Sequence, residues 1–265
     1  IEYEGKEVYL RKDVLIKPFQ NVRKKGQDLI KNEKLIAKHT RITAKHILLL
    51  ASAGVAEVRT LMPLKAGVIA TGDELIDIDS EVINDNVYAS NLYTIEALAN
   101  DAGMDCVYSS ISKDIKSEIK EKITAALNKG IEILVTSGGV SMSKYDHVQD
   151  VLNELGANII FWKVYIKPGK PMLFAEIMWN GKKVLIFGLP GNPVSAFVNF
   201  IIFIRGPISE ILHGFKPMVY SALLKEDIHK KDEKRHFVRG IIEYNNTSGR
   251  NEVIPMVNQS SSNMF

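Results

Sequence analysis

Residues 131–141, IEILVTSGGVS, join a short apolar run to a pair of glycines. An uninterrupted run such as Ile131 to Val135 is typical of a strand that is buried on both faces of a sheet. Gly138 and Gly139 carry no Cβ, so the backbone here can turn tightly or lie against an anion. The stretch therefore predicts a buried strand and a loop, and the loop is interpreted either as a phosphate site or as a plain strand-to-helix turn.

Similar apolar runs alternate with amphipathic helical segments on both sides of this stretch. Strands are expected over 67–70, 106–111, 131–135, 159–162, 172–177 and 184–187, and helices over 91–102, 115–127, 146–155 and 193–205. Asp114 is the expected N-cap of the second helix, and the chain beyond Pro207 is expected to form a kinked or separate turn. This alternation predicts an α/β domain with a doubly wound, mostly parallel sheet and helices on both faces.

The flanking segments have a different pattern, which predicts three domains. Residues 1–64 are interpreted as the remnant of a β-rich N-terminal or linker region, residues 65–214 as the α/β domain, and residues 215–265 as part of a β-barrel domain. Strands are expected over 7–10, 13–16, 219–224, 237–244 and 252–254. Thr43 and Gly54 bound an expected helix over 44–53.

Composition narrows the class of protein. The chain has 265 residues, 46% hydrophobic and 25% charged, which is typical of a soluble globular protein. Its single cysteine excludes a disulfide framework and a four-cysteine zinc site, and the cytoplasm is the expected compartment. The net charge of +3 gives no reason to expect nucleic acid. The charge is uneven, because residues 1–64 hold 13 basic and 7 acidic residues, whereas residues 65–214 hold 13 and 18.

No membrane segment is expected. The start of the chain is charged throughout, unlike a signal peptide. Residues 184–204 are uncharged, but Pro190 and Pro193 interrupt them. The apolar remainder, 194–204, is much shorter than the ~20 residues that a spanning helix needs.

Polar and glycine-rich segments follow the predicted strands. Because ligands bind beyond the carboxyl ends of the strands in doubly wound sheets, these segments are the candidate site. They are Thr71, Gly72, Asp73 and Glu74 after the first strand; Asp114 after the second; Ser137, Gly138, Gly139, Val140, Ser141 and Asp146 after the third; Lys163, Lys167 and Lys170 after the fourth; and Pro190, Gly191, Asn192, Pro193 and Ser195 after the last.

Each group has a functional and a structural interpretation. Carboxylates such as Glu74 and Asp146 suit Mg²⁺ binding or acid–base work, whereas Asp114 is most simply a helix cap. The three lysines are candidate oxyanion contacts, with solvent exposure as the alternative for Lys170. The start of the helix at Pro193 favours anions, or is a plain helix start with Ser195 on its surface. The histidines lack ligand spacing, and Cys106 is expected in the core.

Four of these motifs occur in order, and together they resemble the molybdopterin molybdotransferase family of the MoeA and gephyrin E-domain type. They are TGDEL (71–75), SGGVS (137–141), KPGKP (167–171) and PGNPVS (190–195). The resemblance covers about residues 65–214, and the segments NVRKKGQD (21–28), RHFVRG (235–240) and Gln259-Ser260 match the flanks more loosely. It also implies a truncated chain, with part of the N-terminal region and of the barrel missing.

The resemblance implies a transferase of molybdenum cofactor biosynthesis. Such enzymes take adenylylated molybdopterin and molybdate as substrates and release AMP, with Mg²⁺ as cofactor. By motif, Glu74, Asp114 and Asp146 would be the acidic, metal-binding residues, and Lys163 and Lys167 would contact phosphate or molybdate. The loop 137–141 would bind the pterin phosphate, Pro190 and Pro193 would shape the anion loop, and Ser195 would touch the oxyanion.

The resemblance further implies a homodimer whose partner subunit completes the site, and handover to molybdopterin adenylyltransferase or to apo-molybdoenzymes. Two alternatives stay open at this point. One is a molybdopterin adenylyltransferase on the same core, although that family usually has a single domain. The other is a non-catalytic dimeric scaffold of the gephyrin E-domain type. The basic residues Arg23, Lys24 and Lys25 are a candidate basic wall of the site.

Overall fold

The computed structural model describes residues 2–4, 7–9, 15, 17–139, 147–213, 219–230 and 232–260. The chain divides into two compact units, residues 1–59 and 60–265, and each is described by itself. In the first unit, β1 (Glu2–Glu4) pairs with β2 (Glu7–Tyr9) in antiparallel orientation. Turns then lead to the helix α1 (Ala44–Ser52), whose N-cap is Thr43, as predicted. The strand expected over 13–16 lies outside the described residues, apart from Leu15, which is not in a strand.

A six-stranded sheet forms the centre of the second unit, in the order β6-β3-β7-β11-β10-β8. Its strands are β3 (Lys65–Thr71), β6 (Asp105–Ser112), β7 (Ile133–Ser137), β8 (Asn158–Trp162), β10 (Leu173–Trp179) and β11 (Lys182–Leu189). The neighbours β6, β3, β7 and β11 are parallel, whereas β10 runs antiparallel to both β11 and β8. Since only Asn180 and Gly181 separate β10 from β11, these strands form a hairpin. The mostly parallel sheet is confirmed.

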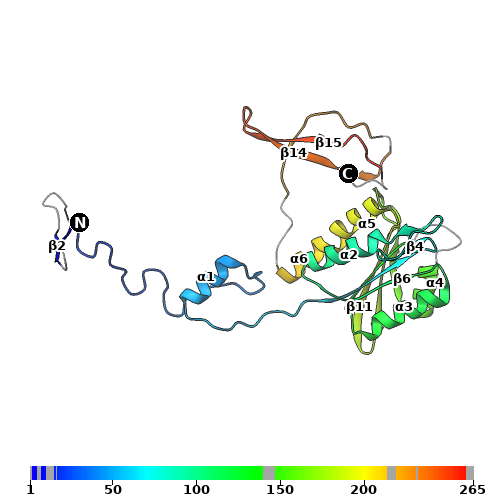
Figure 1. Ribbon diagram of the computed structural model, residues 1–265, viewed down its shortest axis with the longest axis horizontal. Coiled ribbons are helices and arrows are strands. Elements are labelled where there is room, and N and C mark those ends of the chain that lie inside the picture. Colours follow the sequence, from blue (N-terminus) through cyan, green and yellow to red (C-terminus); the bar gives the residue numbers. More distant parts are fainter. Residues whose placement is uncertain are drawn as a thin grey trace. The chain divides into compact units, whose positions relative to one another are not determined.

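Helices cover both faces of this sheet (Figure 1). On one face lie α2 (Ser90–Asp101) and a long helix made of α5 (Pro193–Asn199), the π-helix η1 (Phe200–Arg205) and α6 (Gly206–His213). On the other face lie α3 (Lys116–Asn128) and α4 (His147–Glu154). The two faces bury separate apolar clusters, one around Ile95 and Phe200 and the other around Ile123. The doubly wound architecture is therefore confirmed.

The spacing of apolar residues predicted the buried faces of the helices, but two residues at the start of α3 differ from their predictions. Ile119, Ile123 and Leu127 of α3 are buried as expected, but Ile115 is exposed. The N-cap of α3 is Ile115, so the prediction that Asp114 caps this helix was wrong. Asp114 lies one residue before this N-cap, and its backbone N–H donates to the Asp73 carboxylate.

The long helix differs from its prediction. Helical structure continues through Pro207 to His213 without a break, because η1 directly precedes Gly206. A wide π turn relaxes the hydrogen-bond register that a proline would otherwise disrupt. Residues Pro193–Leu212 are thus one helix, which is long and apolar enough by length and composition to cross a membrane. The sequence predicted a shorter helix that ends at Arg205. Its buried residues, including Phe200 and Ile204, pack on the sheet.

The remaining strands are short. β12 (Leu223–Leu224), β15 (Arg250–Pro255) and β14 (Gly240–Asn245) form a three-stranded sheet, and β4 (Leu75–Ile76) pairs with β5 (Val87–Tyr88). β13 (Arg235–His236) pairs with β9 (Ile166–Lys167), in parallel orientation. The strands expected over 219–224 and 237–244 are therefore shorter than predicted, because only part of each segment finds a pairing strand. Through this pairing, β13 attaches the C-terminal part of the chain to residues 166–167.

Candidate functional site

The loops that follow the parallel strands meet at one edge of the sheet. In the strand register, Thr71 lies opposite Ser112, and Ser137 lies opposite Leu189. Leu173, the first residue of β10, pairs with both Gly188 and Trp162, so the loop between β8 and β10 reaches the same edge. The prediction that the polar, glycine-rich segments gather at one edge is confirmed for the described residues.

The loop after β3 is fastened to the loop after β6. The carboxylate of Asp73 accepts a hydrogen bond from the backbone N–H of Asp114 at 3.0 Å, and the ammonium group of Lys113 donates to the carbonyl of Asp73 at 2.6 Å. Gly72 donates its N–H to the carbonyl of Ser112 at 3.1 Å. Asp73, expected in substrate binding, thus has a clear structural contribution in this position.

The three predicted acidic residues are only partly described. Glu74 is exposed and its carboxylate lies over Gly72, where an added Cβ would be 2.8 Å from the Oε2 atom. Asp114 is half-buried, and Asp146 lies outside the described residues. Within the described ranges, no three His, Cys, Asp or Glu side chains form a group that could hold a metal ion.

The paired glycines after β7 are required by close packing. Both have positive φ, +91° at Gly138 and +62° at Gly139. A Cβ on Gly138 would collide with the carbonyl oxygen of Thr71, and one on Gly139 would lie 2.7 Å from Cγ2 of Val148. Gly138 donates its N–H to the carbonyl of Leu189 at 3.1 Å. Val140 and Ser141, predicted for the same loop, lie outside the described residues.

The buried Thr71 adjoins these glycines. Its hydroxyl is buried and has no hydrogen-bond partner among the described residues. A Cβ added to Gly138 or to Gly139 would lie 2.9 Å from this oxygen. A buried hydroxyl in such a position is a polar group for which a ligand is a natural partner.

Asn91, which the sequence analysis did not place in the site, joins two of its loops. Its side-chain amide donates to Oγ of Ser137 at 2.8 Å and to the carbonyl of Gly191 at 2.6 Å. The Ser137 hydroxyl in turn donates to the carbonyl of Pro190 at 3.3 Å. The Ser137 side chain is thereby committed to holding the loops after β7 and β11 together. The sequence signal was slight, a polar residue at the start of α2.

The segment after β11 passes from buried to exposed before it enters the helix. Pro190 is buried, Gly191 and Asn192 are exposed, and Pro193 is the first residue of α5. Proline suits this position because the first N–H groups of a helix have no intrahelical acceptor. Ser195 is only 3% exposed, so its side chain is not on the helix surface as the structural alternative supposed.

The lysines lie on or beside the loop between β8 and β10. The ammonium group of Lys163 is 3.8 Å from the ring centroid of Trp162, and the residue has a positive φ of 78°. Lys167 and Lys170 are exposed. Backbone bonds from Lys163 to Met172 at 2.7 Å and from Val164 to Lys170 at 3.0 Å close the loop.

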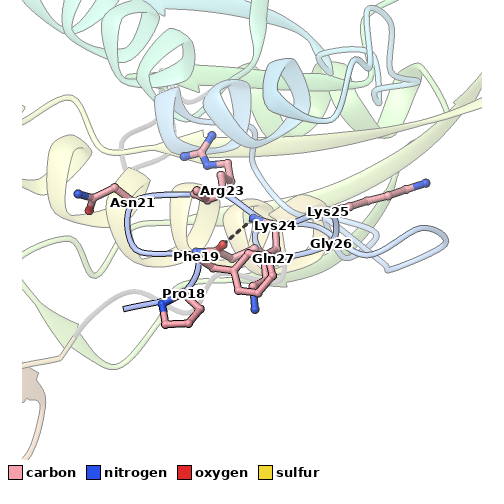
Figure 2. A pocket seen from close by; sticks show the side chains of 9 residues that line it. Pro18, Phe19, Asn21, Arg23, Lys24, Lys25, Gly26 and Gln27 are labelled. Carbon is pink, nitrogen blue, oxygen red and sulfur yellow. Dashed lines mark hydrogen bonds between the residues drawn. The ribbon is translucent and has the colours of Figure 1, made fainter. Parts of the chain in front are cut away.

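The first unit holds the basic segment in an exposed turn. Figure 2 shows a shallow hollow lined by side chains between Pro18 and Gln27. The backbone N–H of Lys24 donates to Oε1 of Gln27 at 3.0 Å, drawn as a dashed line, and the Lys24 ammonium is 4.0 Å from the Phe19 ring centroid. Arg23 forms an ion pair with Asp28 at 2.9 Å.

Cys106 has the environment of a structural thiol. Burial in β6, reinforced by the nearby Glu96 carboxylate, raises the pKa of Cys106 to about 11. The thiolate is the reactive form of cysteine, so this group is almost wholly protonated at neutral pH. The prediction that Cys106 belongs to the core and is not a nucleophile agrees with this environment.

Comparison with known proteins identifies the class to which this architecture belongs. Residues 67–210 match the model of a family described as a probable molybdopterin binding domain. The match covers more than half of the chain and spans the sheet, both helix layers and the four motif segments. The chain belongs to this molybdopterin-binding domain family, as the motifs predicted.

Relatives within this class carry the name molybdopterin molybdenumtransferase. The chain is 34% identical over 243 residues to that of Haemophilus influenzae, covering 90% of this chain and 58% of the relative. It is 27% identical to that of a Nostoc species, covering 93% and 58%. A solved structure of the molybdopterin biosynthesis MoeA protein from Pyrococcus horikosii superimposes with a TM-score of 0.74 at 26% identity, over 89% of this chain and 56% of that one. The chain thus spans just over half the length of these relatives.

Proposed function

We propose that this chain is part of a molybdopterin molybdenumtransferase, which inserts molybdate into adenylylated molybdopterin and releases AMP. The observation that carries the proposal is the gathering of the four motif segments at one edge of the sheet, in a chain similar to proteins of that name. The proposed domains are 1–64, 65–214 and 215–265, of which the second would hold the substrate.

The extent of the similarity favours this enzyme over an adenylyltransferase built on the same core. The match with the Haemophilus influenzae relative covers 243 residues, whereas the α/β core, 65–214, is much shorter. Similarity that extends into the flanking segments is expected for a multidomain molybdenumtransferase. It is not expected for a single-domain enzyme that shares only the core.

The chemistry of the site suits anionic substrates. We infer that phosphate oxygens approach the loop at Gly138 and Gly139, where the Thr71 hydroxyl would donate a hydrogen bond to them. The exposed Lys167 and Lys170 would supply positive charge, and Lys163 would join them by leaving the Trp162 ring. Val140, Ser141 and the start of the long helix at Pro193 would complete the anion site. Molybdate would bind as the second substrate beside these groups.

We propose that three carboxylates would serve as ligands of Mg²⁺. Oxygen donors such as Glu74, Asp114 and Asp146 are those that Mg²⁺ prefers. The described residues do not by themselves assemble such a group. Asp146 would therefore have to complete it. Where Mg²⁺ binds, it would neutralise phosphate charge.

The partners and compartment follow from the same proposal. We propose a homodimer whose partner subunit completes the site, transfer of substrate or product to and from molybdopterin adenylyltransferase and apo-molybdoenzymes, and a cytoplasmic location. Neither nucleic acid nor a membrane is part of the proposal. The buried residues of the long apolar helix pack on the sheet.

The proposal is tested with the full-length protein, adenylylated molybdopterin, Mg²⁺ and molybdate. AMP release and formation of the molybdenum cofactor are the expected products, and their absence in the wild type would contradict the proposal. Asp146→Asn should slow AMP release by at least a hundredfold if this carboxylate serves the reaction. Asp150→Asn is the matched control, because Asp150 is an exposed carboxylate four residues further on. Tungstate in place of molybdate would define the preference for metal.

A non-catalytic scaffold remains the second candidate function, and the same variant separates the two. In cells that lack the endogenous enzyme, a scaffold carrying Asp146→Asn would keep its biological activity. An enzyme would lose it while Asp150→Asn restored it.

A further inference from the structure

Asn199 is a polar residue in the core, at the point where the long helix changes from α to π geometry. It is fully buried, and its side-chain amide donates a hydrogen bond to the carbonyl of Gly169 at 2.9 Å. Its Oδ1 atom has no hydrogen-bond partner among the described residues. Burial of a side-chain amide is costly unless both its donor and its acceptor are used. The presence of Asn199 in the core therefore needs an explanation beyond packing.

Gly169 is fitted to this asparagine. It has a φ of +94°, a backbone conformation that other residues rarely adopt. A Cβ at this position would collide with Oδ1 of Asn199. The two residues therefore interlock, with the glycine backbone lying directly on the asparagine side chain.

The interlock lies in the middle of the loop between β8 and β10, which carries two exposed lysines. Lys167 and Lys170 stand on either side of Pro168 and Gly169. Two further backbone hydrogen bonds hold the loop from another side. The N–H of Arg235 donates to the carbonyl of Tyr165, and the N–H of Phe237 donates to the carbonyl of Lys167. Asn199 adds an attachment from the buried side of the same loop.

We propose that Asn199 is a positioning residue, which fixes the backbone of residues 167–170 and thereby the place of the two lysines at the sheet edge. The identity of the anion that these lysines meet rests on the proposed function, whereas the positioning itself does not. Without the Asn199 amide, the buried carbonyl of Gly169 would lose its donor, and the loop would gain by opening to water.

The first test measures local opening by native-state hydrogen exchange, without any ligand. Asn199→Leu keeps the approximate volume but removes the donor. We expect the protection of the amides of Val164 and Phe237, which bond to this loop, to fall about tenfold. Ile204→Val is the matched control, since Ile204 is fully buried on the same helix and lies outside the interlock. Equal changes in both variants, or no change in Asn199→Leu, would overturn the proposal.

A second variant provides a signature that a merely structural role would not give. In Asn199→Asp, the protonated carboxyl donates to the Gly169 carbonyl, whereas the carboxylate only accepts and repels it. Loop protection, corrected for the intrinsic exchange rate, should therefore decrease as the pH rises through the pKa of the introduced carboxyl. The wild type and Asn199→Leu should lack this dependence, and a flat profile in Asn199→Asp would contradict the proposal.

Turnover by the full-length protein then connects position with function. If Asn199 only positions the lysines, Asn199→Leu should raise KM for adenylylated molybdopterin several-fold more than it lowers kcat, and Ile204→Val should change neither. If both variants raised KM and lowered kcat by equal factors, general destabilisation would be the cause of the effect. If the wild type released no AMP, the proposed function would fail, while the exchange experiment would still decide the positioning.

Discussion

Two exposed basic segments of this chain are held in very different ways. The turn from Phe19 to Gln27 is organised by bonds between near neighbours, such as the N–H of Val22 to the carbonyl of Phe19. The loop from Lys163 to Met172 is held by residues far along the chain, Asn199 and Phe237 among them. Similar charge thus occurs on a locally formed turn and on a loop fixed by tertiary contacts. Only the second is preorganised for a ligand by the described contacts.

The difference bears on how an acidic domain would capture anionic substrates. Residues 65–214 hold 18 acidic and 13 basic residues, so their overall field opposes such ligands. Under the proposed function, capture would depend on local groups, which are the Thr71 hydroxyl beside the glycine loop, the start of the long helix and the lysines. Groups of this kind act only when their positions are fixed.

The largest effect is expected at the glycine loop. Gly138→Ala would force a positive φ on alanine and push its Cβ into the carbonyl oxygen of Thr71. We expect a loss of about 2–4 kcal/mol in the free energy of unfolding, measured in urea. Gly130→Ala is the matched control, because Gly130 has a positive φ of 73° but open space around it. Similar losses in the two variants would show that close packing at the site edge is not what demands glycine.

Asn91→Ala tests the connection between the loops after β7 and β11. It removes the donor of two hydrogen bonds, and we expect a loss of about 1–3 kcal/mol in unfolding free energy. Asn100→Ala, at an exposed position of the same helix, should change stability by less than ~0.5 kcal/mol. If Asn91→Ala changed the unfolding free energy as little as Asn100→Ala, the claim that long-range hydrogen bonds hold the site loops in place would be contradicted.

The thiol of Cys106 reports how readily β6, the edge strand of the sheet, opens to solvent. Because burial raises its pKa to about 11, the thiolate is scarce at pH 8. We expect alkylation of the native protein at least tenfold slower than that of the urea-unfolded chain. The same shift leaves stability unchanged below pH 9 and lowers it as the pH rises from there toward 11. Equal alkylation rates would mean that the strand opens readily.

The smallest effect is expected in the basic turn. Replacing Arg23, Lys24 and Lys25 by alanine should raise the apparent KM of the full-length protein about two- to fivefold at low salt if the turn is a basic wall of the site. The control replaces Lys31, Lys34 and Lys38, which removes the same charge from exposed positions of the same unit. Unchanged kinetics, or equal effects in both triple variants, would show that the turn is ordinary solvated surface and not a wall of the site.

The sequence predicted the layers of the fold well, because periodicity reflects which side chains meet the core. Leu92, Ile95 and Leu98 are buried on α2 as their spacing indicated. It did not predict the antiparallel β10 or the continuation of helix through Pro207, since both depend on pairing and on the π turn that precedes the proline.

At the site, sequence patterns located the loops but not their attachments. Glycine pairs and strand ends are local signals, and they placed Gly138 and Pro190 at the correct edge. Asn91 and Asn199 act on residues that lie between 30 and 100 positions away, so no local pattern could reveal them. Asp146, Val140 and Ser141 stay predictions, because they lie outside the described residues.

The most direct test of the proposed site is a hydrogen-exchange footprint of the full-length protein, with and without adenylylated molybdopterin and molybdate. We expect added protection at the carboxyl edge, in peptides that cover 71–74, 137–141, 163–172 and 190–195. The turns at the opposite edge, around Gly130, Gly156 and Gly181, should exchange as before. Protection confined to that opposite edge, or none in either place, would contradict a site built from the loops after the parallel strands.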